Sequence, residues 1–210
     1  MAVAFQASLL DEPLEPAGVG ALGASVERTE LTAGAWVDLR RSWVHGSDSL
    51  FARLAESVPW QAERREMYER VVDVPRLIRF YGADETLPDP VLIEARDVLN
   101  DHYGAELGEP FRTAGLCYYR DGRDSVAWHG DRIGRGKSED TMVAILSVGE
   151  PRNLLLRPRG GGESLKFSVG HGDLFVMGGS CQRTWEHAVP KTNRPVGPRI
   201  SVQFRPAGVR

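Results

Sequence analysis

Apolar residues follow two different spacings along the chain, and the change between them divides the sequence. In 49–57 and 91–103 they recur at three- and four-residue intervals, which predicts two helices. The longer one follows a helix-breaking run of prolines and an aspartate at 87–90. Part of 31–39 is also expected to be helical.

From residue 114 onward the pattern changes to short runs rich in β-branched and aromatic residues, separated by glycine-rich or charged turns. The predicted strands are 116–119, 141–148, 154–157, 164–169, 173–177 and 198–205. About a hundred residues of short antiparallel strands are typical of a two-sheet barrel. The expected fold class is therefore α+β with a mainly β core: a double-stranded β-helix (jelly roll) with N-terminal helices packed against it.

The same change in pattern gives a domain organisation. Residues 1–24 contain few large apolar residues and many Gly, Pro and Ala, so we expect a loose lead-in there. Residues 25–210 are expected to form one composite domain. Within it, 25–113 would supply helical support and 114–206 the jelly-roll core.

Composition excludes several classes of protein. With 41% hydrophobic and 26% charged residues over 210 positions, the chain can bury a core and is not disordered. No apolar run approaches the roughly 18 residues of a membrane-spanning helix, and the N-terminus lacks a basic signal-peptide region. Cys117 and Cys181 form neither a disulfide framework nor a metal clip. We expect a cytoplasmic protein that does not associate with membranes.

The net charge of -3 conceals an asymmetry between the two halves. Residues 1–110 carry 10 basic and 20 acidic residues, whereas 111–210 carry 16 basic and 9 acidic ones. A basic half is consistent with a polyanionic partner such as nucleic acid. It is also consistent with cations that balance the acidic half across one globule, and charge alone favours this second interpretation.

A candidate metal site comes from His129, Asp131 and His187. On an extended segment His129 and Asp131 point to the same side, and the strands between them and His187 could return the second imidazole to the first. Two histidines and a carboxylate form the facial triad of non-haem Fe(II) oxygenases. The alternative is a simple turn in which Asp131 caps a backbone amide.

The last predicted strand has two different faces. Its apolar residues alternate with Arg199, Ser201, Gln203 and Arg205. A solvated face would explain this pattern. If the polar face lies inside a barrel, however, the two guanidinium groups need anionic partners, which a dicarboxylate cosubstrate and Asp131 would provide.

Four segments together resemble a known family. The segments 116–131, 185–191 and 198–205 resemble the AlkB family of Fe(II)- and 2-oxoglutarate-dependent dioxygenases, and 75–82 resembles its nucleotide-recognition region. The resemblance extends over about 75–206, and the first 60 residues match nothing that we can place. It favours the members that repair nucleic-acid bases.

The resemblance implies a role for individual residues. His129, Asp131 and His187 would bind Fe(II), and Arg205 would lie near Asp131 and the cosubstrate. Arg199, helped by the Tyr119 hydroxyl, would bind the distal carboxylate of 2-oxoglutarate.

Two positions at the cosubstrate site depart from the family pattern. Cys117 and Ser201 stand where many members have asparagine. A thiol and a hydroxyl offer fewer hydrogen bonds than an amide. We therefore expect 2-oxoglutarate to bind, with an altered affinity.

The activity implied by the resemblance is oxidative demethylation of N1-methyladenine and N3-methylcytosine in DNA, with RNA as a second substrate, using O2 and 2-oxoglutarate as cosubstrates. The target base must be flipped or single-stranded to reach a buried iron. His129 could stack on one side of the base and Tyr81 or Phe80 on the other, although a core role for either aromatic is also open. Plausible phosphate contacts, each with an ordinary surface interpretation, are Arg76, Arg120, Arg123, Arg132 and Arg135.

Two other functions fit the same residues. The first is an Fe(II)/2-oxoglutarate hydroxylase that acts on a protein side chain or a small molecule. The second is a barrel that only binds damaged DNA, which would require the triad to be metal-free. Nothing in the sequence demands more than a monomer.

Overall fold

A computed structural model of the chain describes residues 15–67 and 70–209, with side chains described outside 63–74. In chain order its elements are β1 (Gly18–Val19), β2 (Glu27–Glu30), β3 (Ala35–Arg40), β4 (Val44–His45), α1 (Ser47–Ser57), β5 (Gln61–Met67), β6 (Arg70–Tyr81), α2 (Pro90–Leu107), β7 (Phe111–Tyr119), β8 (Val126–His129), β9 (Val143–Gly149), β10 (Arg152–Pro158), β11 (Leu165–Val169), β12 (Asp173–Gly179), α3 (Cys181–Thr184), β13 (Trp185–Val189) and β14 (Arg199–Pro206).

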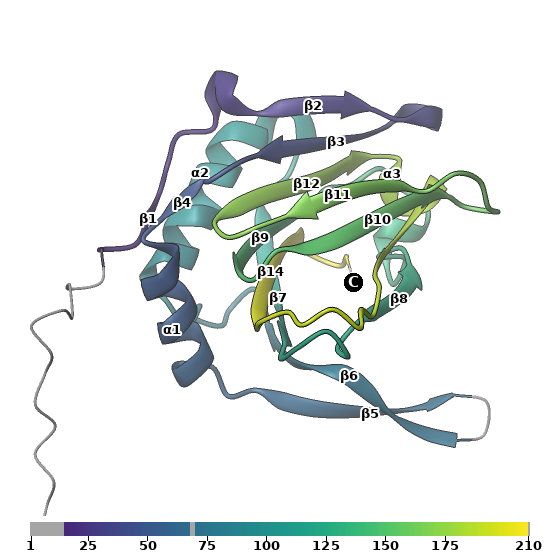
Figure 1. Cartoon of the computed structure of the whole chain (residues 1–210). Helices are drawn as coiled ribbons and strands as arrows, with labels where there is room; N and C mark the ends of the chain where they lie inside the picture. Colours follow the sequence, from purple (N-terminus) through teal and green to yellow (C-terminus); the bar gives the residue numbers. More distant parts are fainter. Residues whose placement is uncertain (1–14, 68–69, 210) are drawn as a thin grey trace, which may run out of the picture.

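Two antiparallel sheets form the body of the protein. The larger has eight strands in the order β2-β3-β12-β9-β14-β7-β6-β5, and the smaller has four in the order β11-β10-β13-β8. In Figure 1 the small sheet faces one side of the large sheet, while α1 and α2 cover the other. This arrangement confirms the predicted α+β fold with a jelly-roll core.

The two faces of the large sheet enter different cores, because side chains alternate along each strand. On β14, Ile200, Val202 and Phe204 pack under the helices. A second core between the two sheets includes Ile145 and Trp185. The polar residues that alternate with the apolar ones on β14 therefore point between the sheets, which is where a site can form.

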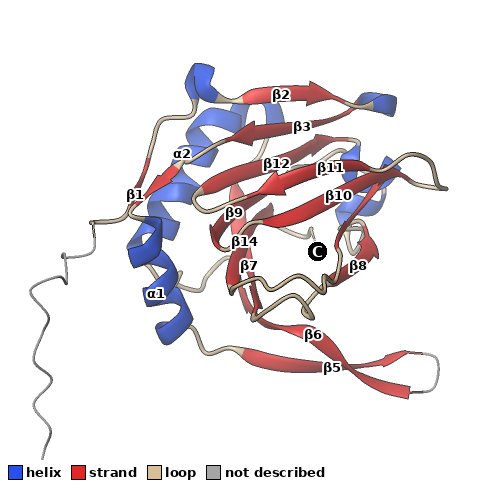
Figure 2. Ribbon diagram, in the orientation of Figure 1, coloured by secondary structure: helices blue, strands red, loops and turns tan. Residues whose placement is uncertain are grey.

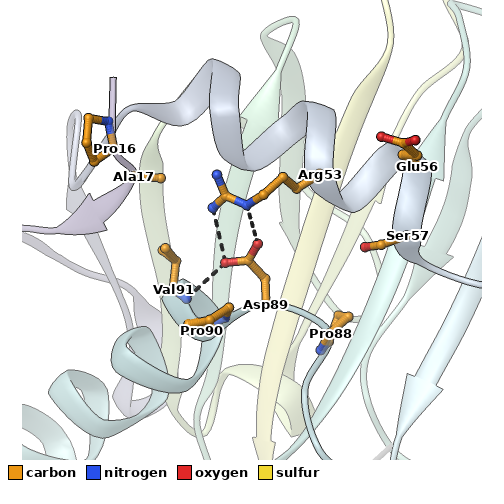
Figure 3. Close-up of a pocket in the computed structure, with 9 residues that line it drawn as sticks. All are labelled: Pro16, Ala17, Arg53, Glu56, Ser57, Pro88, Asp89, Pro90 and Val91. Atoms are coloured by element: carbon orange, nitrogen blue, oxygen red, sulfur yellow. Dashed lines mark hydrogen bonds and ion pairs between the residues drawn. The ribbon is translucent and has the colours of Figure 1, made fainter. Parts of the chain in front are cut away.

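The two helices are joined by one buried carboxylate. Asp89 caps α2 by accepting a 2.9 Å hydrogen bond from the Val91 amide, and Pro90 occupies the first helical turn. The same carboxylate accepts from Arg53 of α1 at 2.7 Å (Figure 3).

In the described part of the chain, no helix has the length and apolar character needed to cross a membrane.

The structure corrects three expectations for the first half. Residues 31–39, expected to be partly helical, contain only a short 3-10 turn at Thr32–Gly34 before β3 begins. The region 25–113 is not mainly helical support, because β2, β3, β5 and β6 all join the large sheet. The expected loose lead-in over 1–24 is wrong for its second part, since β1 pairs with β4, whereas 1–14 lie outside the described residues.

These errors share a cause. β3 reads as Ala-Trp-Val-Asp-Leu-Arg and buries residues on both of its faces, so it lacks the alternation that marks a strand at a surface. Its Asp38 is also buried, where it accepts hydrogen bonds from Arg28 at 2.8 Å and from the Tyr103 hydroxyl at 2.9 Å. Those partners come from β2 and α2, and a local pattern does not reveal them.

Candidate metal centre

Strand register brings the two predicted imidazoles together. On the small sheet His187 of β13 lies directly opposite His129 of β8, and the ring centroids are 4.2 Å apart. Asp131 follows two residues after His129. The ligand atoms of these three residues all lie within 4.8 Å of one another. The structure therefore assembles the predicted triad, although its members are far apart in sequence.

The hydrogen bonds and burial of the cluster orient its imidazoles for metal binding. Nδ1 of His129 lies 2.9 Å from the carbonyl oxygen of Ala127. Because a carbonyl only accepts, Nδ1 is the donor in this contact, and Nε2 is the nitrogen that faces Asp131. Burial, together with the neighbouring His129, lowers the pKa of His187 to about 3, so this imidazole is neutral near pH 7.

Asp131 is held as an anion in a fixed position. Burial raises its pKa, but the positive charge of Arg205, together with the neighbouring histidines, outweighs burial and lowers the pKa to about 2. Arg205 donates from Nε to Asp131 at 2.8 Å. Gly115 makes room for Arg205, since a Cβ at this glycine would lie 2.9 Å from Nη1. The backbone N–H of Asp131 donates to Gln182 at 2.9 Å.

This donor set fits a ferrous ion. Two imidazoles and one carboxylate are the ligands that non-haem Fe(II) sites use on one face of the metal, leaving positions open for other ligands. The cluster is also oriented by its surroundings: the Ala127 carbonyl sets the tautomer of His129, and Arg205 and Gln182 fix Asp131. His129, Asp131 and His187 are thus the residues that would hold iron.

A pocket adjoins the cluster between the two sheets. Its lining residues come from β6, β7, β8, β9, β10, β13 and β14 and are Arg76, Cys117, Tyr119, Val126, His129, Ile145, Leu154, His187, Val189, Arg199, Ser201, Gln203 and Arg205. The pocket lies on the face of the large sheet that points toward the small sheet. Figure 2 shows α1 and α2 on the other face of the large sheet. It is bordered by the His-Asp-His cluster and by the side chains of Arg76, Arg199 and Arg205.

Arg199 makes this pocket suitable for a carboxylate. Its side chain is buried, Nε donates to the Ser147 hydroxyl at 2.8 Å, and the buried Nη1 has no hydrogen-bond partner. Burial raises the pKa of neighbouring Tyr119 to about 12, so its phenol stays protonated and can donate. A buried guanidinium without an anion is costly. An acidic ligand reaching Arg199 would supply the missing partner.

The two departures from the family pattern lie side by side on one wall of the same pocket. Cys117 of β7 pairs in register with Ser201 of β14. Between them Gln203 accepts from the Cys117 thiol at 3.7 Å and donates to the Ser201 hydroxyl. Nε of Arg76 also lies 3.4 Å from the Cys117 sulfur. Gln203 thus brings a side-chain amide to the place where neither Cys117 nor Ser201 has one.

Two aromatic residues were candidates for base stacking, and the structure contradicts this role for Tyr81. Tyr81 is buried in the core beneath the helices, and Arg79 lies over its ring at 4.5 Å. On β6 it pairs with Ala114, whereas Phe80 pairs with Gly115 on the opposite, pocket-side face. The sequence could not resolve this choice, because adjacent strand residues exchange faces with a one-residue shift in register.

The predicted phosphate contacts lie in three settings. Arg76 lines the pocket. Three of the others are engaged by acids: Arg120 by Asp124, Arg123 by Asp121, and Arg135 by Glu109 and Glu139. Arg132 directly follows the ligand Asp131 and has a buried Nε without a hydrogen-bond partner. Each exposed pair contributes little to stability, so these cations remain candidates for contact with a polyanion.

A wider hollow elsewhere lacks comparable chemistry. It measures about 620 Å³ and lies against α1 and the start of α2. Figure 3 shows that Arg53 and Asp89, the paired groups within it, are already bonded to each other. The smaller pocket beside the histidines is therefore the candidate active site.

The sequence analysis gave no role to three residues of the site. It placed Gln203 on the polar face of the last strand with Arg199 but assigned it no function. Ser147 and Gln182 come from β9 and α3, and they reach Arg199 and Asp131 only through the tertiary fold. No local signal marks either of them.

Comparisons with known proteins agree with this geometry. The family model described as the 2OG-Fe(II) oxygenase superfamily matches residues 84–205, which include the His-Asp-His cluster and every residue of the adjoining pocket except Arg76. The bovine alpha-ketoglutarate-dependent dioxygenase alkB homolog 3 (Bos taurus) is 30% identical over 193 residues, covering 81% of this chain and 63% of the relative. The human DNA oxidative demethylase ALKBH2 (Homo sapiens) is 25% identical, covering 76% and 68%.

A solved structure shows the same fold. OsALKBH1 superposes with a TM-score of 0.60 at 14% identity, covering 86% of this chain and 100% of the other. The chain spans about three fifths of the length of the alkB homolog 3 relatives, whose matched shares range from 61% to 63%.

Proposed function

Because the chain belongs to the 2OG-Fe(II) oxygenase superfamily and, within it, to the AlkB family, we propose that it is an Fe(II)- and 2-oxoglutarate-dependent dioxygenase that demethylates nucleic-acid bases. One observation carries the proposal: a His-Asp-His cluster lies beside a pocket that ends in a buried arginine without an anion. The substrates would be N1-methyladenine and N3-methylcytosine. The cellular role would be the direct reversal of alkylation damage.

Each side chain of the site has a task in this reaction. His129, Asp131 and His187 would hold Fe(II), and Arg205 keeps Asp131 anionic and in place. Arg199 would form the ion pair with the distal carboxylate of 2-oxoglutarate. When bound, Fe(II) and 2-oxoglutarate would activate O2: one oxygen atom would oxidise 2-oxoglutarate to succinate and CO2, and the other would be inserted into a methyl C–H bond. The carbinolamine that results releases formaldehyde and the repaired base.

The pocket walls contribute by excluding water. Ile145, Leu154 and Val189 line the pocket between the two sheets and are largely buried. Apolar walls protect a reactive centre from bulk solvent and strengthen the electrostatic interactions within it. The arrangement thus places the charges of Arg199 and Arg205 where they act in a medium of low polarity.

Several observations support a nucleic-acid substrate. The relatives include a DNA oxidative demethylase. Residues 111–210, which contain the site, carry an excess of basic residues. A methyl group at N1 of adenine or N3 of cytosine blocks base pairing, so these lesions cost less to flip toward a buried metal.

The proposal is tested with purified protein and methylated oligonucleotides. Single- and double-stranded substrates containing N3-methylcytosine are incubated with Fe(II), 2-oxoglutarate and O2, and formaldehyde and succinate are measured. Wild type should release both in equal amounts, and Asp131→Asn should release neither. Substrate binding should weaken steeply with salt, as expected when phosphate contacts displace counterions.

A different result would identify the alternative function. If wild type consumes 2-oxoglutarate but leaves every methylated strand intact, the iron chemistry stands and the substrate assignment is wrong. A protein side chain or a small molecule would then be the target. If Fe(II) and 2-oxoglutarate do not bind at all, the dioxygenase assignment itself is refuted.

A further inference from the structure

A row of polar side chains runs along the pocket face of β14, from the buried guanidinium to the arginine that holds Asp131. In chain order the row is Arg199, Ser201, Gln203 and Arg205, and all four line the pocket. Positions two apart on a strand are separated by about 6–7 Å. A ligand that reaches from Arg199 toward the metal cluster therefore passes Ser201, which is 3% exposed, and Gln203, which is 8% exposed.

The contacts of the Gln203 side chain fix the direction of its amide. Its terminal nitrogen lies 2.9 Å from the carbonyl oxygen of Ser201. Because a carbonyl only accepts, this atom must be the NH2 group, and the amide oxygen faces the Cys117 thiol at 3.7 Å. The same NH2 group donates to the Ser201 hydroxyl. Gln203 is therefore a donor toward Ser201 and an acceptor toward Cys117.

This orientation leaves the Ser201 hydroxyl with a hydrogen to donate. A hydroxyl carries one hydrogen and two lone pairs, and one lone pair of Ser201 already accepts from Gln203. Within the part of the chain that the structure describes, no group accepts the hydrogen in return. A buried donor is normally paired, so a ligand atom that accepts would complete the arrangement. A carboxylate or oxo oxygen has this chemistry.

A glycine on the neighbouring strand makes room for the Gln203 side chain. β7 and β14 lie side by side in the large sheet (Figure 1), and Gly115 of β7 pairs in register with Gln203. A Cβ at Gly115 would lie 3.2 Å from Oε1 of Gln203 and 2.9 Å from Nη1 of Arg205. A larger residue at this position would crowd both side chains. The place of the amide in the pocket wall is thus set by the tertiary structure.

We propose that Gln203 is a positioning residue for 2-oxoglutarate: its amide orients the Ser201 hydroxyl so that this hydroxyl donates to an oxygen of the bound cosubstrate. The inference rests on the proposed function and adds to it a pair of residues that act together. Position 201 carries asparagine in many members of the family, and here a hydroxyl and the amide behind it supply the donor. Arg199 contributes charge, and Ser201 contributes a directed hydrogen bond.

Removing either partner should weaken 2-oxoglutarate binding by a similar factor. Gln203→Met keeps the length of the side chain but removes the amide, so the Ser201 hydroxyl is no longer held in one direction. Ser201→Ala removes the hydroxyl itself. Loss of a hydrogen bond to a charged group corresponds to a loss of affinity of about tenfold. Because Gln203 acts through Ser201, the double variant should bind no more weakly than Ser201→Ala.

The test measures 2-oxoglutarate binding by calorimetry with Fe(II) and without O2, and Fe(II) binding in a separate titration. Asn100→Leu is the matched control, because Asn100 lies on α2 and its side-chain amide is also bonded to the backbone. It donates to the Phe111 carbonyl at 3.4 Å and accepts from the Phe111 N–H at 2.7 Å. This variant should lose stability yet keep its 2-oxoglutarate affinity within twofold, which separates the loss of a buried amide from the loss of a ligand contact.

Gln203→Met, Ser201→Ala and the double variant should each bind 2-oxoglutarate about tenfold more weakly than wild type and bind Fe(II) within twofold of it. In turnover, their KM for 2-oxoglutarate should rise about tenfold while kcat at saturating 2-oxoglutarate stays within threefold.

Unchanged 2-oxoglutarate affinity in Gln203→Met, losses that add in the double variant, or an equal loss of Fe(II) affinity would overturn the role of Gln203. Demethylation by wild type would then still uphold the proposed function. If wild type does not bind 2-oxoglutarate in the presence of Fe(II), both the inference and the proposed function fail.

Discussion

Replacing Arg199 by methionine should separate the stability of this protein from its affinity for 2-oxoglutarate. Arg199 is 3% exposed, and no ion pair involves it among the described residues. Burial holds the pKa of its guanidinium below the usual range. This buried charge donates a hydrogen bond to Ser147 at 2.8 Å and lies 5.3 Å from the centre of the Tyr119 ring, with no carboxylate paired to it among the described residues.

The two effects have opposite signs. Burying one charge costs several kcal/mol even after relaxation, and methionine of similar length removes that cost. Leaving the Ser147 hydroxyl without its partner costs about 1–3 kcal/mol. The metal-free variant should thus be at least as stable as wild type. The loss of charge-assisted hydrogen bonds to a carboxylate, worth about 3 kcal/mol, should weaken 2-oxoglutarate binding about a hundredfold.

Arg152 provides a matched control, since it is also a buried arginine beside Tyr119. Its guanidinium donates to the carbonyl oxygens of Asp121, Asp124 and Pro190 at 3.1, 3.0 and 2.8 Å. Arg152→Met would leave these oxygens without a donor and should destabilise the protein by about 3 kcal/mol.

The assay measures thermal unfolding without ligands, and 2-oxoglutarate binding by calorimetry with Fe(II) under anaerobic conditions. Arg199→Met should keep its midpoint and lose affinity, whereas Arg152→Met should lower its midpoint and, while folded, keep most of its affinity. The reasoning is refuted if Arg199→Met unfolds several degrees below wild type and still binds 2-oxoglutarate within threefold.

Three further predictions follow from the same contacts. Gln182→Ala should weaken Fe(II) binding about tenfold, because it removes the acceptor that orients Asp131; unchanged iron affinity by titration would contradict this. Tyr81→Leu should lower the unfolding free energy by about 1–3 kcal/mol yet leave oligonucleotide affinity within twofold, and a large loss of affinity in folded protein would restore Tyr81 as a base contact. Burial raises the pKa of the Cys181 thiol to about 12, so a thiol reagent added to the native protein at pH 8 should modify Cys117 alone. Bound 2-oxoglutarate should slow this modification. Two fast-reacting thiols would show that Cys181 is not buried.

Much of the candidate site could be predicted from short sequence patterns. The His129 and Asp131 pair and the polar face of β14 depend only on the two-residue repeat of an extended chain, which survives in any fold that keeps these strands. The chemistry of the facial triad added His187, and the family resemblance then assigned Arg199 to 2-oxoglutarate and Arg205 to Asp131 and the cosubstrate. Within the helices, the three- and four-residue repeat was equally local and gave α1 and α2 nearly in full.

Other parts required contacts between distant segments. The side of the sheet on which Tyr81 lies depends on the register of β6 against β7, and a shift by one residue would reverse it. The contribution of Ser147 and Gln182 depends on where β9 and α3 are placed relative to Arg199 and Asp131. No pattern within either segment carries that information.

The sequence by itself therefore determined which side chains share a face of a strand or helix, and so which chemistry the chain can bring together. Tertiary structure alone decided that His129 and His187 lie opposite each other and that Arg199 is buried without an anion. The physical reason is range. Backbone periodicity acts over a few residues, whereas burial and electrostatic environment are set by neighbours that may be more than a hundred positions away in the chain.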